Sequence, residues 1–235
     1  MTIKKHIPNL LTLGNLLSGV IATIFAVKGD YQVVAIFVML GIVFDFFDGF
    51  VARLLNISGE LGKQLDSLAD MVTSGVVPGI VLYKLLEQTQ IGDFSDTNFL
   101  PYIGLLITLA ACYRLANFNI DTRQTDSFIG LPTPAMALFV ISLPLVVANS
   151  EYHFFVDLVQ NSYFLIGVTV LFSYLMNAEI PLFALKFKTF GLKENGLKYL
   201  FLLASVLFIV FLQFIAIPLI IVLYVLVSFL VKSEK

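Results

Sequence analysis

Cysteine and histidine are almost missing from this sequence. Its 235 residues contain one cysteine, Cys112, and two histidines, His6 and His153, which lie far apart. A single cysteine excludes an intramolecular disulfide framework, and the two histidines fit no metal-binding spacing. The sequence therefore carries no zinc signature.

Charge is also scarce. Only 13% of the residues are charged and the net charge is −2. No basic stripe is present, which argues against nucleic-acid binding. In contrast, 59% of the residues are hydrophobic and the mean hydropathy is +0.95. Since a soluble domain is usually about 45–50% apolar, the composition indicates a membrane protein.

Long apolar runs predict an all-α fold, a polytopic transmembrane bundle of about eight helices. A spanning helix needs about 20 apolar residues. The N-terminal run follows two lysines without a small-residue cleavage site, so we expect a retained helix rather than a signal peptide. The last two runs meet near Gln213, and a broken hairpin that does not fully span is the alternative. The expected helices cover residues 9–27, 32–55, 64–86, 99–118, 132–149, 163–182, 197–212 and 214–231.

The distribution of basic residues predicts the orientation. Cytoplasmic ends of membrane helices are enriched in Lys and Arg. With both termini inside, only Lys28 and Lys84 of the fourteen basic residues fall on the outer side. The 54–63 link and the 119–131 loop are then cytoplasmic, and we expect the functional site on this side.

Four aspartates interrupt the second and third apolar runs. Asp45 and Asp48 are three residues apart and Asp66 and Asp70 are four apart, so each pair shares one helix face. Turn-forming residues lie between them and predict an antiparallel hairpin that turns near residues 57–58. Asp45 is then level with Asp70, and Asp48 with Asp66, about 12 Å inside the cytoplasmic helix ends.

Four such carboxylates require positive charge nearby. An intramembrane carboxylate costs several kcal/mol, and like charges repel. Oxygen-only ligands favour Mg²⁺, Mn²⁺ or Ca²⁺, and paired cations are the usual device for phosphoryl transfer. Gly49, Ala52 and Gly62 lie beside the aspartates, where small residues admit a ligand. The alternative is that they permit close helix packing.

The pattern Asp45-x-x-Asp48-Gly49-x-x-Ala52-Arg53, then Gly62-x-x-x-Asp66-x-x-x-Asp70, resembles the signature of the CDP-alcohol phosphotransferases. Eight positions over 26 residues match. The stretches "IPNLLTLGNLLSG" (7–19), "RLANFN" (114–119) and "GLPTPAMA" (130–137) resemble the phosphatidylserine synthase branch. The resemblance implies one integral-membrane domain over 1–235, with a core at 7–182 and a C-terminal helix pair at 197–231.

The resemblance also implies the chemistry. An enzyme of this kind transfers the phosphatidyl group of CDP-diacylglycerol to L-serine and releases CMP, with two divalent cations, Mg²⁺ or Mn²⁺, and works as a homodimer. Asp70 is implied as the general base that deprotonates serine. The implied metal ligands are Asp45, Asp48, Asp66 and Asp70, and the implied contacts to the CDP part are Gly49, Ala52, Arg53, Ser58, Gly59, Gly62, Thr12 and Asn15.

The acceptor site is expected on the fourth helix. The fork of Arg114 fits a carboxylate, and Asn117 and Asn119 add amides nearby. The alternative for Arg114 is an anchor at the lipid headgroups. No nucleophilic Ser–His or Cys–His arrangement stands out, so direct displacement is expected.

Two other functions remain open. A relative with another acceptor, glycerol 3-phosphate or inositol phosphate, would need several converging basic residues. A divalent-cation transporter would need polar residues through the membrane, whereas residues 33–43 and 76–83 are nearly all apolar.

Overall fold

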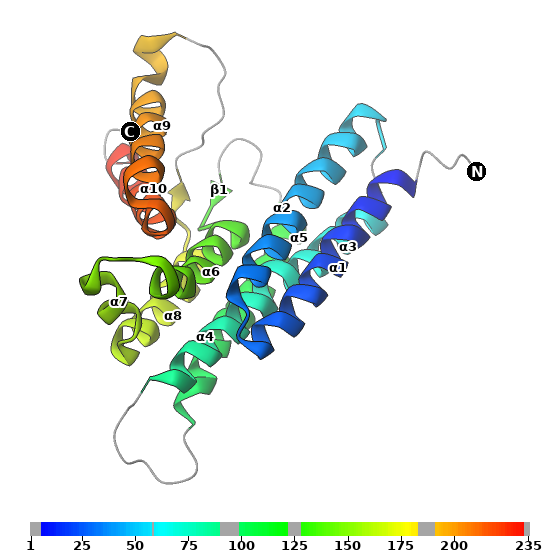
Figure 1. The fold of residues 1–235 in the computed structure, drawn as a ribbon. Helices are drawn as coiled ribbons and strands as arrows, with labels where there is room; N and C mark the ends of the chain where they lie inside the picture. The colour runs from blue at the N-terminus through cyan, green and yellow to red at the C-terminus, as the bar shows by residue number, and fades with distance from the viewer. Residues whose placement is uncertain (1–5, 58, 90–98, 122–127, 183–190, 233–235) are drawn as a thin grey trace.

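The fold is a bundle of helices (Figure 1). The computed structural model describes residues 6–57, 59–89, 99–121, 128–182 and 191–232. Its α-helices are α1 (Ile7–Lys28), α2 (Tyr31–Leu54), α3 (Glu60–Asp70), α4 (Val77–Gln88), α5 (Leu106–Ile120), α6 (Thr133–Asn149), α7 (His153–Val159), α8 (Ser162–Asn177), α9 (Leu192–Leu212) and α10 (Ala216–Lys232). The shorter elements are β1 (Phe128–Ile129), β2 (Pro181–Leu182), a π-helical segment (Met71–Val76) and 3-10 helices at Leu100–Leu105 and Gln213–Ile215.

Helices α1 and α2 form a tight antiparallel pair at one end of the molecule (Figure 1). Gly29 ends α1 with a φ of 78°, a left-handed conformation that glycine adopts without steric cost. Asp30 then caps α2, because its side chain accepts a hydrogen bond from the Val33 N–H at 3.3 Å. This short turn brings the face of α1 that holds small residues against α2.

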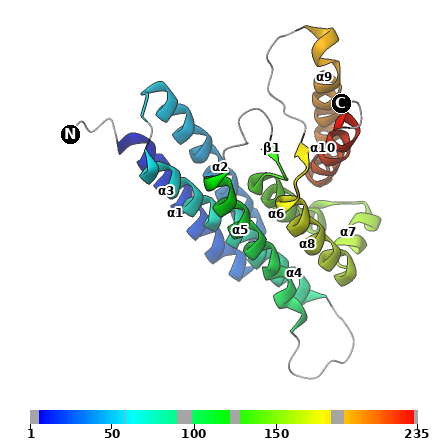
Figure 2. The ribbon, with the colours of Figure 1, turned by 180° about the vertical axis from the view of Figure 1, so that it is seen from behind.

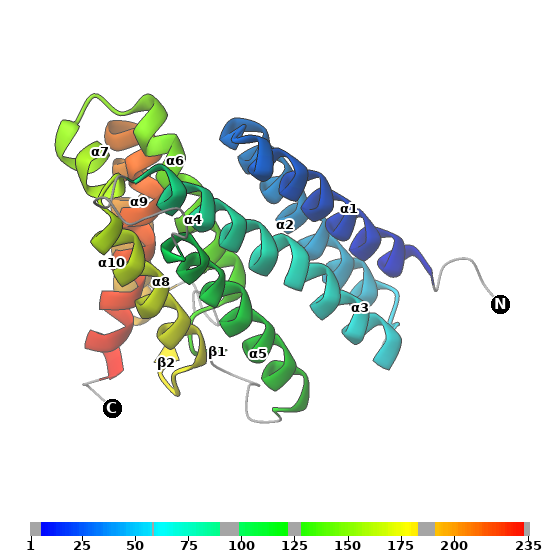
Figure 3. The ribbon, with the colours of Figure 1, turned by 90° about the horizontal axis from the view of Figure 1, so that it is seen from below.

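The third span is one long helix with a change of winding. Helix α3 continues through the π-helical segment into α4, as seen from below in Figure 3. The chain enters α3 from α2 through Asn56, whose φ is 51°. The predicted hairpin of the second and third helices is therefore confirmed, with its turn between the end of α2 at Leu54 and the start of α3 at Glu60.

The other half of the bundle is built on α6. Helix α6 contacts α4, α8 and α10, while α5 packs on α8. Figure 2 shows α4 and α5 between the α1–α3 group and the C-terminal helices. The rings of Phe139 and Phe172 pack together inside this half, tilted by 35° with centroids 4.3 Å apart. The predicted join at Gln213 is confirmed, because Gln213 has a φ of 47° between α9 and α10.

Several stretches are long and apolar enough to cross a membrane. Within the described residues there are five, and six if the bent pair α7–α8, with an angle of 70°, counts as one span. Helix α6 is apolar but has 17 residues, and α9 and α10 together form one 35-residue apolar stretch from Asn195 to Phe229. Outward-facing side chains such as Leu10, Leu109 and Phe211 are apolar, as lipid contact requires. The chain is therefore a multi-pass membrane protein.

The predicted end of the sixth helix was wrong. The sixth run was expected to stay helical to residue 182, but α8 ends at Asn177. Residues Pro181 and Leu182 instead pair antiparallel with Ile129 and Phe128. Proline lacks the N–H that a helix interior needs and disfavours helical backbone in the residue before it, which explains the early end.

Candidate active site

The aspartates of α2 and α3 meet at one place. Ligand oxygens of Asp45, Asp48 and Asp66 all lie within 4.8 Å of one another. Asp48 is buried and the other two are half-buried. Asp70, also half-buried, lies close enough to Asp45 and Asp66 for their charges to interact. The two helices therefore bring all four predicted carboxylates into one cluster.

This cluster fits a bound cation. Three convergent carboxylate oxygens supply the hard ligands that Mg²⁺ and Mn²⁺ prefer. Among the described residues, no ion pair involves these aspartates. Carboxylates gathered without a cationic side chain to compensate them are best explained by a metal, since buried charges are otherwise paired.

Helix α1 forms a third wall of the cluster. The Thr12 hydroxyl donates to Asp48 Oδ2 at 2.5 Å, and the Asn15 amide donates from Nδ2 to Asp70 Oδ1 at 3.0 Å. Both residues were expected to reach the nucleotide, which stays a prediction. Their bonds to the aspartates were not foreseen, although polar residues three apart on an apolar helix gave the signal.

The π-helical segment begins directly after Asp70 and was missed from the sequence. The Thr73 hydroxyl donates to the backbone carbonyl of Asn15 at 3.1 Å. Thr73 also fills the space left by Gly19, where a Cβ would overlap its hydroxyl. Single-turn π segments occur frequently at functional sites. The segment thus fixes the part of the helix that follows Asp70 against α1.

At both motif glycines a Cβ would make only ordinary contacts. A Cβ at Gly49 would meet nothing closer than Arg53 Nη1 at 3.9 Å, and at Gly62 nothing closer than Asn9 Oδ1 at 3.5 Å. Gly104, in contrast, packs so closely that a Cβ would lie 2.8 Å from the Tyr83 nitrogen. Close helix packing therefore does not explain Gly49 and Gly62.

The remaining expected nucleotide contacts lie around the same turn. Ala52 is half-buried at the end of α2, while Arg53 and Gly59 are exposed. Ser58 lies outside the described residues. In the sequence, these positions lie between Gly49 and Gly62.

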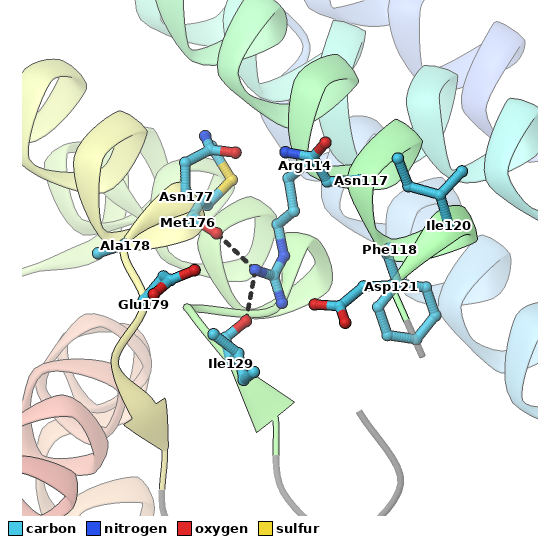
Figure 4. A pocket seen from close by; sticks show the side chains of 10 residues that line it. All are labelled: Arg114, Asn117, Phe118, Ile120, Asp121, Ile129, Met176, Asn177, Ala178 and Glu179. Atoms are coloured by element: carbon cyan, nitrogen blue, oxygen red, sulfur yellow. Dashed lines mark hydrogen bonds between the residues drawn. The ribbon is translucent and has the colours of Figure 1, made fainter. Parts of the chain in front are cut away.

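Arg114 is an internal clamp rather than a headgroup anchor. Its side chain is buried and donates to the carbonyl of Gly130 at 3.1 Å. It also donates to the carbonyls of Ile129, at 3.0 Å, and Met176, the two bonds drawn in Figure 4. Gly130, with a φ of 74°, has no room for a Cβ, which would lie 2.7 Å from Arg114 Nη1. Arg114 therefore fastens the segment before α6 to the end of α8.

A cavity of about 390 Å³ lies beside Arg114. Of the expected acceptor residues, Arg114 and Asn117 line it and Asn119 does not. Asn119 instead accepts a hydrogen bond from Ser67 at 3.1 Å, next to Asp66, and its carbonyl accepts one from Lys63. The lining residues are Arg114, Asn117, Phe118, Ile120, Asp121, Ile129, Met176, Asn177, Ala178 and Glu179 (Figure 4).

Fold and site together define a multi-pass helical membrane protein with an acidic cluster suited to divalent cations. Comparison with known proteins identifies the family: the profile of the CDP-alcohol phosphatidyltransferases matches residues 5–185. The chain belongs to this family.

Three curated relatives illustrate the similarity. The CDP-diacylglycerol–serine O-phosphatidyltransferase of Bacillus subtilis is 35% identical over 153 residues, covering 61% of this chain and 81% of the relative. The archaetidylserine synthase of Methanothermobacter thermautotrophicus is 35% identical over 148 residues, covering 62% and 60%. The Helicobacter pylori (strain J99) CDP-diacylglycerol–serine O-phosphatidyltransferase is 31% identical over 175 residues, covering 74% and 70%.

Proposed function

We propose that this protein transfers the phosphatidyl group of CDP-diacylglycerol to L-serine, giving phosphatidylserine and CMP. The observation that carries the proposal is the convergence of Asp45, Asp48 and Asp66 within 4.8 Å, with Asp70 beside them. The names of the Bacillus subtilis and Helicobacter pylori relatives support serine as the acceptor. The whole chain acts as one domain in this proposal, and two copies form a homodimer.

The four aspartates bind two divalent cations, Mg²⁺ or Mn²⁺, in this proposal. When bound, the cations neutralise the diphosphate and stabilise the leaving CMP. Asp45, Asp48 and Asp66 serve as ligands, and Asp70 is both a ligand and the general base. Support comes from the oxygen-only donor set and from the lack of cationic partners for these aspartates among the described residues.

The chain's own residues perform the transfer in one displacement. Asp70 accepts the proton of the serine hydroxyl as the serine oxygen forms a bond to the phosphorus that bears diacylglycerol. The bond from this phosphorus to the bridging oxygen breaks, and that oxygen leaves with CMP. Holding the serine oxygen in line with the phosphorus supplies much of the rate.

The CDP part is proposed to lie over the open faces of the motif glycines. Gly49, Ala52 and Gly62 line the cytidine pocket, and Arg53, Ser58 and Gly59 contact the diphosphate side. Thr12 and Asn15 approach from α1. The ordinary contact distances at the Cβ positions of Gly49 and Gly62 support this assignment, because close helix packing does not require glycine there.

The acceptor pocket is proposed beside Arg114 and Asn117, with Asn119 at its edge. Among the lining residues described, Arg114 is the one basic side chain and Asp121 and Glu179 are acidic. A phosphorylated acceptor would meet these two carboxylates without a cluster of cations. The cavity therefore favours serine, whose ammonium suits acidic neighbours, over glycerol 3-phosphate or inositol phosphate.

The site is proposed to face the cytoplasm of a bacterial-type inner membrane, with both termini inside. The basic residues support this orientation, because only Lys28 and Lys84 fall on the other side. A cation transporter is disfavoured, because a conduction path would need polar residues beyond the aspartate cluster. The buried side chains there are apolar: Val34, Val38, Val77 and Leu82.

The test compares acceptors directly. Membranes containing the protein are incubated with CDP-diacylglycerol, Mn²⁺ or Mg²⁺, and labelled serine, glycerol 3-phosphate or inositol phosphate. We expect label in lipid, and CMP release, with serine alone. Transfer to a phosphorylated acceptor in place of serine would overturn the acceptor, and no CMP release with any acceptor would overturn the proposed function.

A further inference from the structure

Asn15 is buried without any exposed surface inside a membrane helix, and its amide is only half paired. Its Nδ2 donates to Asp70 Oδ1 at 3.0 Å. Its Oδ1 has no hydrogen-bond partner among the described residues. Leaving a buried polar atom unpaired costs about 1–3 kcal/mol. An apolar side chain would fill this place at less cost, so packing alone does not explain an asparagine here.

The surrounding residues are adapted to this amide. At Gly41 on α2, a Cβ would lie 2.8 Å from Asn15 Oδ1 and 2.8 Å from Thr73 Cγ2. Glycine at position 41 therefore makes room for the amide and for Thr73 together. The amide is held in place although one of its two polar atoms gains no bond.

The main chain of Asn15 is tied to the same part of the third span. Thr73 donates to the Asn15 carbonyl at 3.1 Å, and Thr73 lies in the π-helical segment that begins just after Asp70. Asn15 thus contacts this span twice, through its side chain at Asp70 and through its carbonyl at Thr73. These two bonds set the register of α1 against Asp70.

We propose that Asn15 is a positioning residue for Asp70. Its N–H holds Oδ1 and fixes the rotation of the carboxylate, so that Oδ2 is presented to the cation or to the acceptor hydroxyl. An amide donor suits this task because it carries no charge and cannot compete as an anionic ligand. The inference rests on the proposed function, which gives Asp70 its roles as ligand and base.

The experiment measures cation binding without substrates. Purified protein is titrated with Mn²⁺ and free Mn²⁺ is followed by electron paramagnetic resonance. Asn15→Leu keeps a similar volume and removes the donor. Since outer-shell partners typically contribute about 10–100-fold to metal affinity, we expect the weaker of the two Mn²⁺ sites to lose affinity in that range.

Ser18 provides the matched control. It is buried one turn further along α1, and its hydroxyl donates within the helix to the Gly14 carbonyl at 2.8 Å. Ser18→Ala is expected to bind Mn²⁺ as the unaltered protein does. In an Asp70→Asn background, where residue 70 no longer supplies an anionic ligand, Asn15→Leu is expected to leave the remaining Mn²⁺ binding unchanged.

Two results would overturn the inference. One is unchanged Mn²⁺ affinity in Asn15→Leu. The other is an equal loss of affinity with Asp70 and in the Asp70→Asn background, because such a loss would come from a general structural effect. If Asn15→Leu is not recovered as folded protein, Asn15→Ala carries the same comparison with the same expectations. Serine-dependent CMP release by the unaltered protein is measured in parallel. A lack of CMP release would contradict the proposed function. Unchanged Mn²⁺ affinity in Asn15→Leu would contradict only the role of Asn15.

Discussion

Thr12 and Asp48, 36 residues apart in the chain, are joined by a hydrogen bond of 2.5 Å between α1 and α2. One turn further along α1, Asn15 makes the corresponding bond to Asp70 at 3.0 Å. The first helix therefore holds one aspartate from each of the two helices that carry the signature. This relationship leads to predictions that separate the roles of the site residues.

Asp70→Asn tests the general base. The change keeps the shape of the side chain and its capacity to accept from Asn15, but removes the carboxylate that takes the serine proton. A positioned base contributes about 10²–10⁴-fold, so we expect serine-dependent CMP release to fall by at least that much. Normal membrane insertion of the variant is the control. Full activity would remove Asp70 from the role of base.

Thr12→Val tests the bond to Asp48. Valine keeps the shape and loses the hydroxyl, so Asp48 is held less firmly. We expect about 10–100-fold weaker activation by Mn²⁺, measured as the Mn²⁺ concentration that gives half-maximal CMP release.

Thr23→Val is the control for Thr12→Val, because the Thr23 hydroxyl donates within its own helix, to the Gly19 carbonyl at 2.9 Å. Equal Mn²⁺ requirements in the two variants would contradict the role given to Thr12.

Gly62→Ala and Gly19→Ala are expected to act in opposite ways. A Cβ at Gly62 would make only an ordinary contact, with Asn9 Oδ1 at 3.5 Å. Because alanine in a helix interior is favoured over glycine by about 1 kcal/mol, thermal stability should hold or rise. The KM for CDP-diacylglycerol should rise, since the methyl group enters the proposed cytidine pocket. Kinetics and thermal melting of the purified variants give both readouts.

At Gly19 a methyl group would overlap the Thr73 hydroxyl and approach its backbone nitrogen to 3.0 Å. We expect Gly19→Ala to lower the melting temperature. A stable Gly19→Ala and a Gly62→Ala with unchanged KM would together contradict the packing and ligand roles assigned to the two glycines.

Arg114→Met tests the clamp. The variant leaves the carbonyls of Ile129, Gly130 and Met176 without their donor. Because unpaired buried groups are costly, we expect a loss on the order of 3 kcal/mol in the free energy of unfolding. Tyr113→Met, on the exposed side of the same helix, should melt as the unaltered protein does. Equal melting temperatures of the Arg114→Met and Tyr113→Met variants would contradict the role of Arg114 as a clamp.

The sequence predicted the parts of the fold that depend on local signals. Apolar runs give the helices to within a few residues, and the turn around Asn56 follows from its turn-forming neighbours. The spacing of Asp45, Asp48, Asp66 and Asp70 gives the face that each occupies. Three- and four-residue spacings carry this information without reference to distant contacts.

Features set by distant contacts could not be predicted in the same way. The winding change after Asp70 depends on how Thr73 fits between Gly19 and Gly41, three residues on three helices. The pairing of Pro181 with Ile129 depends on Arg114, which gathers both segments. Likewise, the chemistry of Arg114 suggested a carboxylate ligand, whereas burial commits its guanidinium to backbone carbonyls.

The most direct test of the account is the location of Mn²⁺ in the protein. Crystals grown with MnCl₂ and a CDP-linked donor should give two anomalous peaks between α2 and α3, each within bonding distance of carboxylates from Asp45, Asp48, Asp66 and Asp70. Bound donor without a manganese peak at these carboxylates would contradict it.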